Sequence, residues 1–339
     1  MTGSARLRGA RPAPARVLFG HEMPDAVGER IIREAGHALH ATRGMDALRA
    51  AIAEADAVYV RPPVFADRAL LREGRRLRVV ATSGTGLDHI DVAAATEYGI
   101  AVVNVQGIGA VAVAEHTVGL ALALAKRIPW VDRMTRRGEF AIRYQPVFEE
   151  LAGKTVALIG YGAIGQAVAH RLGIGLGMRV LVFSRTAVPP EAVPGLDVIQ
   201  ADSLREALAA ADLVSLHLPL TPGTRHLIGR EQLQWMKPSA WLLNTSRGAL
   251  VDEHALVDAL RRGAIAGAAL DVFEQEPAAA DNPLFALDNV IVSPHLAGLN
   301  RQTSERLSRS AATGICHVLA GRRPSCLVNP EVWPEQESS

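Results

Sequence analysis

Short apolar runs rich in β-branched residues alternate with helix-patterned segments along most of the chain. Such alternation is typical of parallel α/β structure, because each connection between neighbouring parallel strands crosses the sheet and usually contains a helix. The runs fall into two sets, separated by a long apolar segment of helical pattern. The pattern therefore predicts an α/β protein with two parallel sheets, each doubly wound by helices.

The first set predicts strands at residues 15–20, 57–60, 77–81 and 101–105. Helical patterns lie between these strands at residues 26–35, 67–73 and 91–98. Gly99 follows the last of them, and glycine is favoured just beyond the C-terminus of a helix.

The second set predicts six strands, at residues 155–159, 179–183, 213–218, 241–244, 266–270 and 290–292. Six strands with right-handed crossovers complete one doubly wound sheet. Long helical patterns at residues 111–127 and 302–319 flank this set, and we expect the chain to cross between domains there. The expected organisation is a flexible tail (1–14), a discontinuous domain (15–106 and 299–339) and an inserted domain (107–298).

Gly160, Gly162 and Gly165 form a G-x-G-x-x-G pattern between a predicted strand and a predicted helix. In this setting the first glycine permits a tight turn, the second lets the backbone approach a pyrophosphate, and the third lets the helix pack on the strand. The start of the helix, at Ala163 and Ile164, would face the anion. The inserted domain is therefore predicted to be a Rossmann domain that binds a dinucleotide.

The second predicted strand of this domain ends in Ser184, Arg185 and Thr186. NAD-binding domains usually carry Asp or Glu here, which would repel the 2′-phosphate of NADP. A neutral serine beside a planar guanidinium would instead receive that phosphate. We therefore expect NADP(H) to be favoured; if Arg185 is only a solvated charge, NAD(H) remains possible.

An arginine, a glutamate and a histidine each lie at or just past the end of a later predicted strand, where open α/β sheets place their chemistry. They are Arg247, Glu276 and His295. Together with the glycine pattern, their segments resemble the D-isomer-specific 2-hydroxyacid dehydrogenases. The resemblance extends over residues 60–330 and includes the runs 83–91, 113–116 and 327–330.

This resemblance implies hydride transfer between a nicotinamide and the carbonyl carbon of a small 2-oxo acid, giving a D-2-hydroxy acid. His295 would protonate the carbonyl oxygen, a role that suits a side chain whose ordinary pKa lies near working pH. Glu276 would fix the imidazole tautomer, and Arg247 would bind the carboxylate or the carbonyl oxygen. Asp271 would orient the nicotinamide amide. The inserted domain would bind the cofactor, and the discontinuous, flavodoxin-like domain would bind the substrate.

Further cofactor contacts are expected by the same resemblance. They are expected at His217, Pro219, Thr245, His295 and Gly298. His217 would lend its backbone, whereas His116 is interpreted as a packing or interdomain residue.

The substrate is expected to bind near a glycine-rich turn that contains Ser83, Gly84 and Thr85. Backbone amides of such a turn can form an anion nest for a carboxylate. Arg61 matches a substrate-side arginine of the family, or else it is a solvated charge before two prolines. Phosphoglycerate dehydrogenases commonly carry a second arginine before this turn, but here that position is Thr82.

The neutral Thr82, the expected NADP preference and the compact chain favour a glyoxylate or hydroxypyruvate reductase. The alternative enzyme is a phosphoglycerate-type or other larger D-2-hydroxyacid dehydrogenase. An alternative from another class is a dinucleotide-sensing binding protein of the corepressor type, built on the same fold. Turnover of a panel of 2-oxo acids would separate the three.

Composition and the apolar pattern bear on which kinds of partner, compartment and assembly we expect. The 36 basic and 35 acidic side chains in 339 residues nearly cancel, which gives no reason to expect a nucleic-acid partner. The most apolar stretch, residues 108–125, contains Glu115 and His116, so we expect a buried helix and no membrane span.

Cys316 and Cys326 are too few for a disulfide framework, which fits a cytoplasmic protein, and no metal site is expected. By resemblance, we expect a homodimer that buries the region of the apolar helix.

Overall fold

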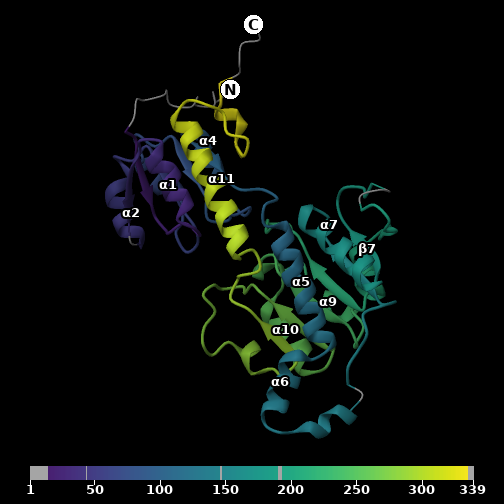
Figure 1. The fold of residues 1–339 in the computed structure, drawn as a ribbon. Helices are drawn as coiled ribbons and strands as arrows, with labels where there is room; N and C mark the ends of the chain where they lie inside the picture. The colour runs from purple at the N-terminus through teal and green to yellow at the C-terminus, as the bar shows by residue number, and fades with distance from the viewer. Residues whose placement is uncertain (1–13, 43, 146, 190–192, 335–339) are drawn as a thin grey trace. The chain divides into compact units, whose positions relative to one another are not determined.

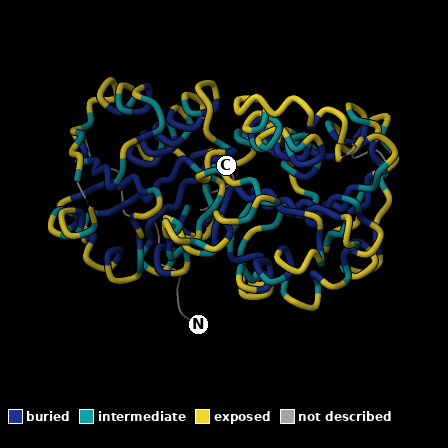
Figure 2. Tube along the Cα trace, turned by 90° about the horizontal axis from the view of Figure 1, so that it is seen from below, coloured by how far each residue is buried: buried dark blue, intermediate teal, exposed yellow. Residues whose placement is uncertain are grey.

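The computed structural model describes residues 14–42, 44–145, 147–189 and 193–334. The predicted tail therefore lies, apart from Pro14, outside the described residues. The chain forms two compact units, one from the described residues of Met1–Gly109 and Leu299–Ser339, the other from those of Ala110–Gly298 (Figure 1). In both units the buried residues lie toward the interior of the trace, and the exposed residues lie on its outer turns (Figure 2).

The first unit contains a five-stranded parallel sheet of order β2-β1-β3-β4-β5. The strands are β1 (Arg16–Phe19), β2 (Ala38–Ala41), β3 (Ala57–Tyr59), β4 (Val79–Ala81) and β5 (Ala101–Val103). The helices are α1 (Val27–Glu34), α2 (Gly44–Ile52), α3 (Arg68–Glu73), α4 (Val92–Glu97) and α11 (Arg301–Leu319), with a short 3-10 turn, η5, at Pro330–Val332. Strand β2 was missed by the sequence analysis, because its four residues are an edge strand with little burial and no β-branched side chain.

Alternate residues of each strand enter two separate cores, as the period of two in a strand requires. Val17 and Phe19 of β1 pack toward α11, whereas Leu18 joins the core formed with α2, α3 and α4. The buried Arg78, just before β4, donates to the carbonyls of Val318 and Leu319 (2.7 and 2.9 Å). A cation at the C-terminal end of α11 is favourable for the helix dipole, and it anchors this late helix on the early sheet.

The second unit contains a seven-stranded parallel sheet of order β12-β11-β10-β9-β6-β7-β8. The strands are β6 (Thr155–Ile159), β7 (Arg179–Phe183), β8 (Val198–Gln200), β9 (Leu213–Leu216), β10 (Trp241–Asn244), β11 (Gly267–Leu270) and β12 (Val290–Val292). The prediction of six strands was wrong by one. The missing strand, β8, is a three-residue edge strand with two exposed side chains, so it lacks the apolar signal of its neighbours.

Helices cover both faces of this sheet. They are α5 (Ala110–Ala125), α6 (Ile128–Arg136), α7 (Ala163–Ala169), α8 (Leu204–Ala210), α9 (Arg230–Trp235) and α10 (Glu253–Arg261). Short helical turns are η1 (Phe140–Tyr144), η2 (His170–Gly175), η3 (Gly248–Leu250) and η4 (Pro283–Ala286). Helix α5 ends at Ala125, two residues earlier than predicted, and Arg127 adopts a left-handed conformation before α6 begins. Within the described ranges, no helix combines the length and apolarity needed to span a membrane.

Candidate active site

The carboxyl ends of the parallel strands meet at one edge of the seven-stranded sheet. Nearly every residue predicted for the cofactor or the chemistry lies on a segment that leaves this edge. Those segments follow β6, β7, β9, β10, β11 and β12. Ligands of open α/β sheets bind at such an edge, so the topology gathers residues that are far apart in the chain.

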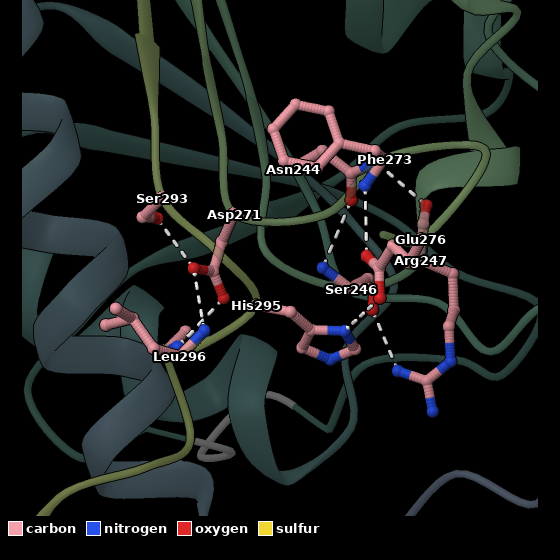
Figure 3. Close-up of polar contacts among 10 residues, drawn as sticks. Asn244, Ser246, Arg247, Asp271, Phe273, Glu276, Ser293, His295 and Leu296 are labelled. Atoms are coloured by element: carbon pink, nitrogen blue, oxygen red, sulfur yellow. Dashed lines mark hydrogen bonds and ion pairs between the residues drawn. The ribbon is translucent and has the colours of Figure 1, made fainter. Parts of the chain in front are cut away.

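His295 and Glu276 form the closest polar pair of the predicted catalytic residues. The His295 Nδ1 and Glu276 Oε2 atoms lie 2.7 Å apart, and the imidazole is directed at the carboxylate (Figure 3). The other carboxylate oxygen of Glu276 accepts a hydrogen bond from the Phe273 amide at 3.0 Å. His295 has φ +52°, a left-handed conformation that is uncommon for residues other than glycine. Its ring remains about half exposed, so a substrate has access to it.

Opposing effects act on the pKa of Glu276. Burial raises it, but the hydrogen bond and charge of His295, the Phe273 amide and the positive charge of Arg247 together bring it below the usual value. Glu276 is therefore ionised at neutral pH. An ionised carboxylate is a strong acceptor for a hydrogen on the His295 Nδ1 atom.

Arg247 lies on the turn after β10. Asn244 shapes this turn, because its side chain donates to the Arg247 carbonyl (2.8 Å) and accepts from the Ser246 amide (3.1 Å). The guanidinium donates to the Ser246 carbonyl at 2.8 Å (Figure 3). A side chain at Gly248 would collide with the Phe273 carbonyl. Gly248 thus lets the Arg247 turn pack against the loop that carries Glu276, a requirement that the sequence analysis did not identify.

Asp271 follows β11 and is completely buried. Its carboxylate accepts from the Ser293 hydroxyl (2.6 Å) and from the amides of Leu296 (3.0 Å) and Ala297 (2.8 Å). The backbone of His295 donates to the Asp271 carbonyl at 2.7 Å. In this conformation the carboxylate is bonded to the loop around His295, so the contact with a nicotinamide amide stays a prediction.

The glycine turn after β6 fits the requirements of a dinucleotide. Gly160 has φ +101°, and a side chain there would collide with the His217 carbonyl; a side chain at Gly165 would collide with the Gly160 carbonyl. Gly162 differs, because its backbone is extended and a side chain there would meet no protein atom within 4 Å. The fold therefore requires two of the glycines, and Gly162 leaves open space where a ligand would pass close to the backbone.

Comparison with known proteins agrees with this arrangement. The family model described as the NAD-binding domain of D-isomer specific 2-hydroxyacid dehydrogenases matches residues 118–297. A glyoxylate reductase from Aeropyrum pernix is 44% identical over 285 residues, covering 82% of this chain and 84% of the relative. One from Thermofilum pendens is 42% identical over 271 residues, covering 78% and 79%. The chain belongs to the D-isomer specific 2-hydroxyacid dehydrogenase family. It is an oxidoreductase acting on CH–OH groups, as predicted from its motifs.

A solved structure extends the comparison to 96% of the chain. The NADPH-dependent glyoxylate/hydroxypyruvate reductase from Sinorhizobium meliloti, in complex with NADP and malonate, has a TM-score of 0.85 and 27% identity, covering 96% of this chain and 100% of that one. The prediction of two parallel-sheet α/β domains is thus confirmed.

The remaining cofactor candidates of this dehydrogenase also lie at the carboxyl edge. Ser184 lies directly after β7, next to the glycine turn, because the Gly160 amide donates to the Phe183 carbonyl (2.9 Å). Its hydroxyl accepts from the Thr186 amide at 3.3 Å. Arg185 is exposed, and it has no ion-pair partner among the residues that the structure describes. Ser184 and Arg185 are thus accessible at the point where a ribose would lie.

His217, Pro219, Thr245 and Gly298 also border this edge. Burial lowers the pKa of His217 to about 4, so this imidazole is neutral, and its Nε2 lies 2.9 Å from the Ser215 hydroxyl. The Thr245 hydroxyl lies 3.0 Å from that of Thr117 on α5. The Pro219 carbonyl accepts from the Thr224 hydroxyl at 2.8 Å, and Gly298 lies against Val113. In the described part of the chain, no cluster of His, Cys, Asp and Glu could hold a metal ion.

The predicted substrate residues belong to the first unit. Ser83, Gly84 and Thr85 follow β4, and Arg61 lies just beyond β3. Two hydrogen bonds join the turn to the segment just after β5. The Thr85 hydroxyl donates to the Val105 carbonyl (2.9 Å), and the Asn104 side chain donates to the Thr85 carbonyl (3.0 Å). The turn is therefore fixed by hydrogen bonds, while Thr85 itself remains exposed.

Tyr59, which the sequence analysis missed, connects two of these candidates. Its buried phenol donates to the Ser83 hydroxyl at 2.5 Å and also interacts with the Arg61 guanidinium. Burial raises the pKa of Tyr59 to about 12, so the phenol remains a donor at neutral pH. An apolar strand ending in a tyrosine gave no signal of this role, because a buried aromatic residue usually contributes only to packing.

Proposed function

We propose that this dehydrogenase reduces a small, unphosphorylated 2-oxo acid of the glyoxylate or hydroxypyruvate type to the D-2-hydroxy acid. The observation that carries the proposal is the His295–Glu276 pair at 2.7 Å, with Arg247 close enough for its charge to act on Glu276. In this proposal His295 is the proton donor, Glu276 is the anion that stabilises it, and Arg247 is the cation that binds the substrate carboxylate.

The bound nicotinamide supplies the hydride. His295 donates a proton to the carbonyl oxygen as negative charge develops there. Glu276 accepts the Nδ1–H bond, keeps the opposite ring nitrogen directed outward and stabilises the imidazolium. Arg247 binds the carboxylate or the carbonyl oxygen through its planar set of donors. In the first unit, Arg61 and the amides of Ser83, Gly84 and Thr85 provide anion-binding groups for the same substrate class.

Thr82 argues for an unphosphorylated acid. It is buried, and its hydroxyl lies 3.2 Å from the His89 Nε2 atom, so this position offers a neutral hydroxyl where a phosphate would favour a cation. The glyoxylate reductases named above support the same choice. A D-3-phosphoglycerate dehydrogenase from Methanocaldococcus jannaschii is 41% identical, but the match covers only 54% of that relative's length.

NADPH is the proposed cofactor. A neutral Ser184 followed by an exposed Arg185, which has no ion-pair partner within the described ranges, suits a 2′-phosphate better than a ribose diol. The proposed assembly is a homodimer, and the proposed location is the cytoplasm, which agrees with two unpaired cysteines.

The test is a rate measurement with NADPH and NADH on glyoxylate, hydroxypyruvate, phosphohydroxypyruvate and larger 2-oxo acids. We expect rapid reduction of glyoxylate or hydroxypyruvate, and loss of about 10²–10⁴-fold in kcat for His295→Ala with cofactor binding retained. Preference for the phosphorylated acid would indicate the phosphoglycerate-type enzyme. Tight cofactor binding without turnover of any acid would indicate a dinucleotide-sensing protein, and a fully active His295→Ala enzyme would contradict the mechanism.

A further inference from the structure

A continuous set of hydrogen bonds links helix α5 to the loop that carries His295. The His116 Nε2 atom lies 3.0 Å from the Ser293 hydroxyl, which lies 2.6 Å from the Asp271 carboxylate. His116 itself is 3.7 Å from the same carboxylate oxygen of Asp271. Nothing in the proposed chemistry uses His116 or Ser293, although both lie beside the residues that do.

The direction of these bonds follows from the donors available. The Asp271 carboxylate accepts from the amides of Leu296 and Ala297, and the Ser293 hydroxyl donates to it as well. Having used its single proton, the Ser293 oxygen must accept from His116, and the His116 Nε2 atom therefore carries a hydrogen. Both the imidazolium and one neutral tautomer of His116 meet this condition. The chain of bonds thus runs from His116 through Ser293 to Asp271.

Asp271 connects this chain of hydrogen bonds to the backbone around His295. Its carboxylate binds the amides of Leu296 and Ala297, and its carbonyl binds the amide of His295. Figure 3 shows the Asp271 carboxylate on one side of the His295 backbone, with the imidazole extending to Glu276 on the other. The backbone of His295 lies at φ +52°, a conformation that the surrounding contacts must maintain.

We infer that His116 and Ser293 are positioning residues, which hold the Asp271 carboxylate and thereby the loop that directs the His295 imidazole at Glu276. The inference rests on the proposed function only in assuming that His295 is the proton donor. His116 does more than pack against the sheet, because its N–H keeps the Ser293 hydroxyl directed at Asp271. The charged groups that face this set of hydrogen bonds are Asp271 and, beside the imidazole of His295, Glu276 and Arg247.

The test compares His116→Leu, Ser293→Ala and their double variant with two conservative variants. His116→Gln retains an N–H donor, and Ser293→Thr retains the hydroxyl. His254→Leu, an exposed histidine on α10 in the same unit, is the matched control. The measurements are kcat and KM for the best 2-oxo acid, the dissociation constant of NADPH, the pH profile of kcat, and the ¹H NMR signal of the His295 Nδ1–H bonded to Glu276.

We expect His116→Leu and Ser293→Ala each to lower kcat by about 10- to 100-fold, because small displacements of a reacting group have effects of this size. KM and NADPH binding should change little, the pH profile of kcat should shift, and the downfield Nδ1–H signal should broaden or move. The double variant should resemble Ser293→Ala alone, since both changes interrupt one chain of bonds. His116→Gln and Ser293→Thr should recover most of kcat.

The inference is overturned if His116→Leu and Ser293→Ala keep the kcat, pH profile and NMR signal of the unmodified enzyme. It is equally overturned if they lower only thermal stability, or if His254→Leu has the same effect. Failure of the proposed function looks different: the unmodified enzyme would reduce none of the acids, while the NMR signal would still respond to the two substitutions.

Discussion

Glu276 lies half-buried beside His295, and its carboxyl group keeps its charge because hydrogen bonds and the charges of His295 and Arg247 outweigh the effect of burial on its pKa. At the scale of single residues, this balance decides the chemistry. A neutral side chain of the same shape would still accept a hydrogen bond from His295, but it would no longer stabilise the imidazolium.

Glu276→Gln is therefore expected to lower kcat for 2-oxo acid reduction on the order of 10²-fold at neutral pH. The pH profile of kcat should also change, because the substituted side chain carries no negative charge beside His295. A pH series of kcat measures this. Since the pKa of Glu276 is lowered on folding, its contribution to stability is present at neutral pH and is lost only below about 4.5, its ordinary value. An unchanged pH profile in Glu276→Gln would count against the role of Glu276.

Ser184→Asp tests the cofactor at the same scale. A carboxylate there would repel the 2′-phosphate of NADPH and accept hydrogen bonds from the ribose hydroxyls of NADH. We expect the ratio of kcat/KM for NADPH to that for NADH to fall by about 10-fold or more, as one lost charge-assisted contact implies. The matched control is Thr186→Ser, which keeps a hydroxyl nearby and introduces no charge. Equal selectivity in Ser184→Asp and the unmodified enzyme would refute the NADPH assignment.

At the scale of elements, the turn between β6 and α7 separates what the fold needs from what a ligand needs. Gly160 and Gly165 face protein carbonyls, whereas Gly162 faces open space in an extended conformation that any residue adopts. Within one motif, Gly160 and Gly165 are therefore needed for the packing of the turn, and Gly162 is needed only for the approach of a ligand.

Gly162→Ala should consequently fold with nearly unchanged thermal stability but bind NADPH about 10-fold or more weakly, because its methyl group would occupy the path of the pyrophosphate. Gly165→Ala should instead lose stability, since its methyl group would meet the Gly160 carbonyl. Fluorescence titration and thermal unfolding of both variants give the comparison. Normal NADPH affinity in Gly162→Ala would show that the ligand does not approach this turn.

His217, just after β9, links the stability of the second unit to pH. Its pKa is about 4 in the folded protein and about 6.5 when exposed, so the unfolded chain binds the extra proton between these values. Stability should therefore fall as pH decreases from 6.5 to 4, by roughly 2–3 kcal/mol. Urea unfolding across this range should show a smaller loss in His217→Asn. An identical loss in that variant would assign the effect to other groups, such as His37 in the first unit, whose pKa is also lowered by burial.

At the scale of the whole molecule, several large apolar side chains of the second unit are exposed in the structure as described. None of the residues of α6 is buried, and Ile128, Phe140 and Tyr144 are 52%, 65% and 81% exposed. A hollow of about 560 Å³ lies between α6 and Phe148. These three residues lie in the segments that follow α5, whereas on α5 itself half of the residues are buried and Val111 is 46% exposed.

We expect a second copy of this chain to cover these side chains, since large apolar patches are uncommon on monomers. The unmodified enzyme should sediment at twice 36.1 kDa, and Phe140→Glu combined with Tyr144→Glu should shift it toward the monomer. Ile174→Glu, at an exposed apolar residue elsewhere in the unit, is the control and should remain dimeric. Sedimentation of the unmodified enzyme as a monomer would refute the proposed homodimer.

The interior strands, the long helices and the glycine turn could be predicted from the sequence, because each depends on residues that are neighbours in the chain. Strands β6 and β7 have continuous apolar runs, and Gly99 marks the end of α4 with φ +67°. The same local signals failed for β2 and β8. Each of these two edge strands has one neighbouring strand and little burial, so its sequence needs no strong apolar pattern.

The sequence by itself determined the elements other than β2 and β8, and the chemical groups that leave their ends: the cofactor turn, Arg247, Glu276 and His295. Only the tertiary structure decided which of these groups meet. It brought Gly248 against Phe273, Tyr59 against Ser83, and His116 against Ser293, 177 residues apart in the chain. The reason is physical: local conformation depends on adjacent residues, whereas the partner of a buried polar group is whichever donor or acceptor the packing of distant elements leaves within reach.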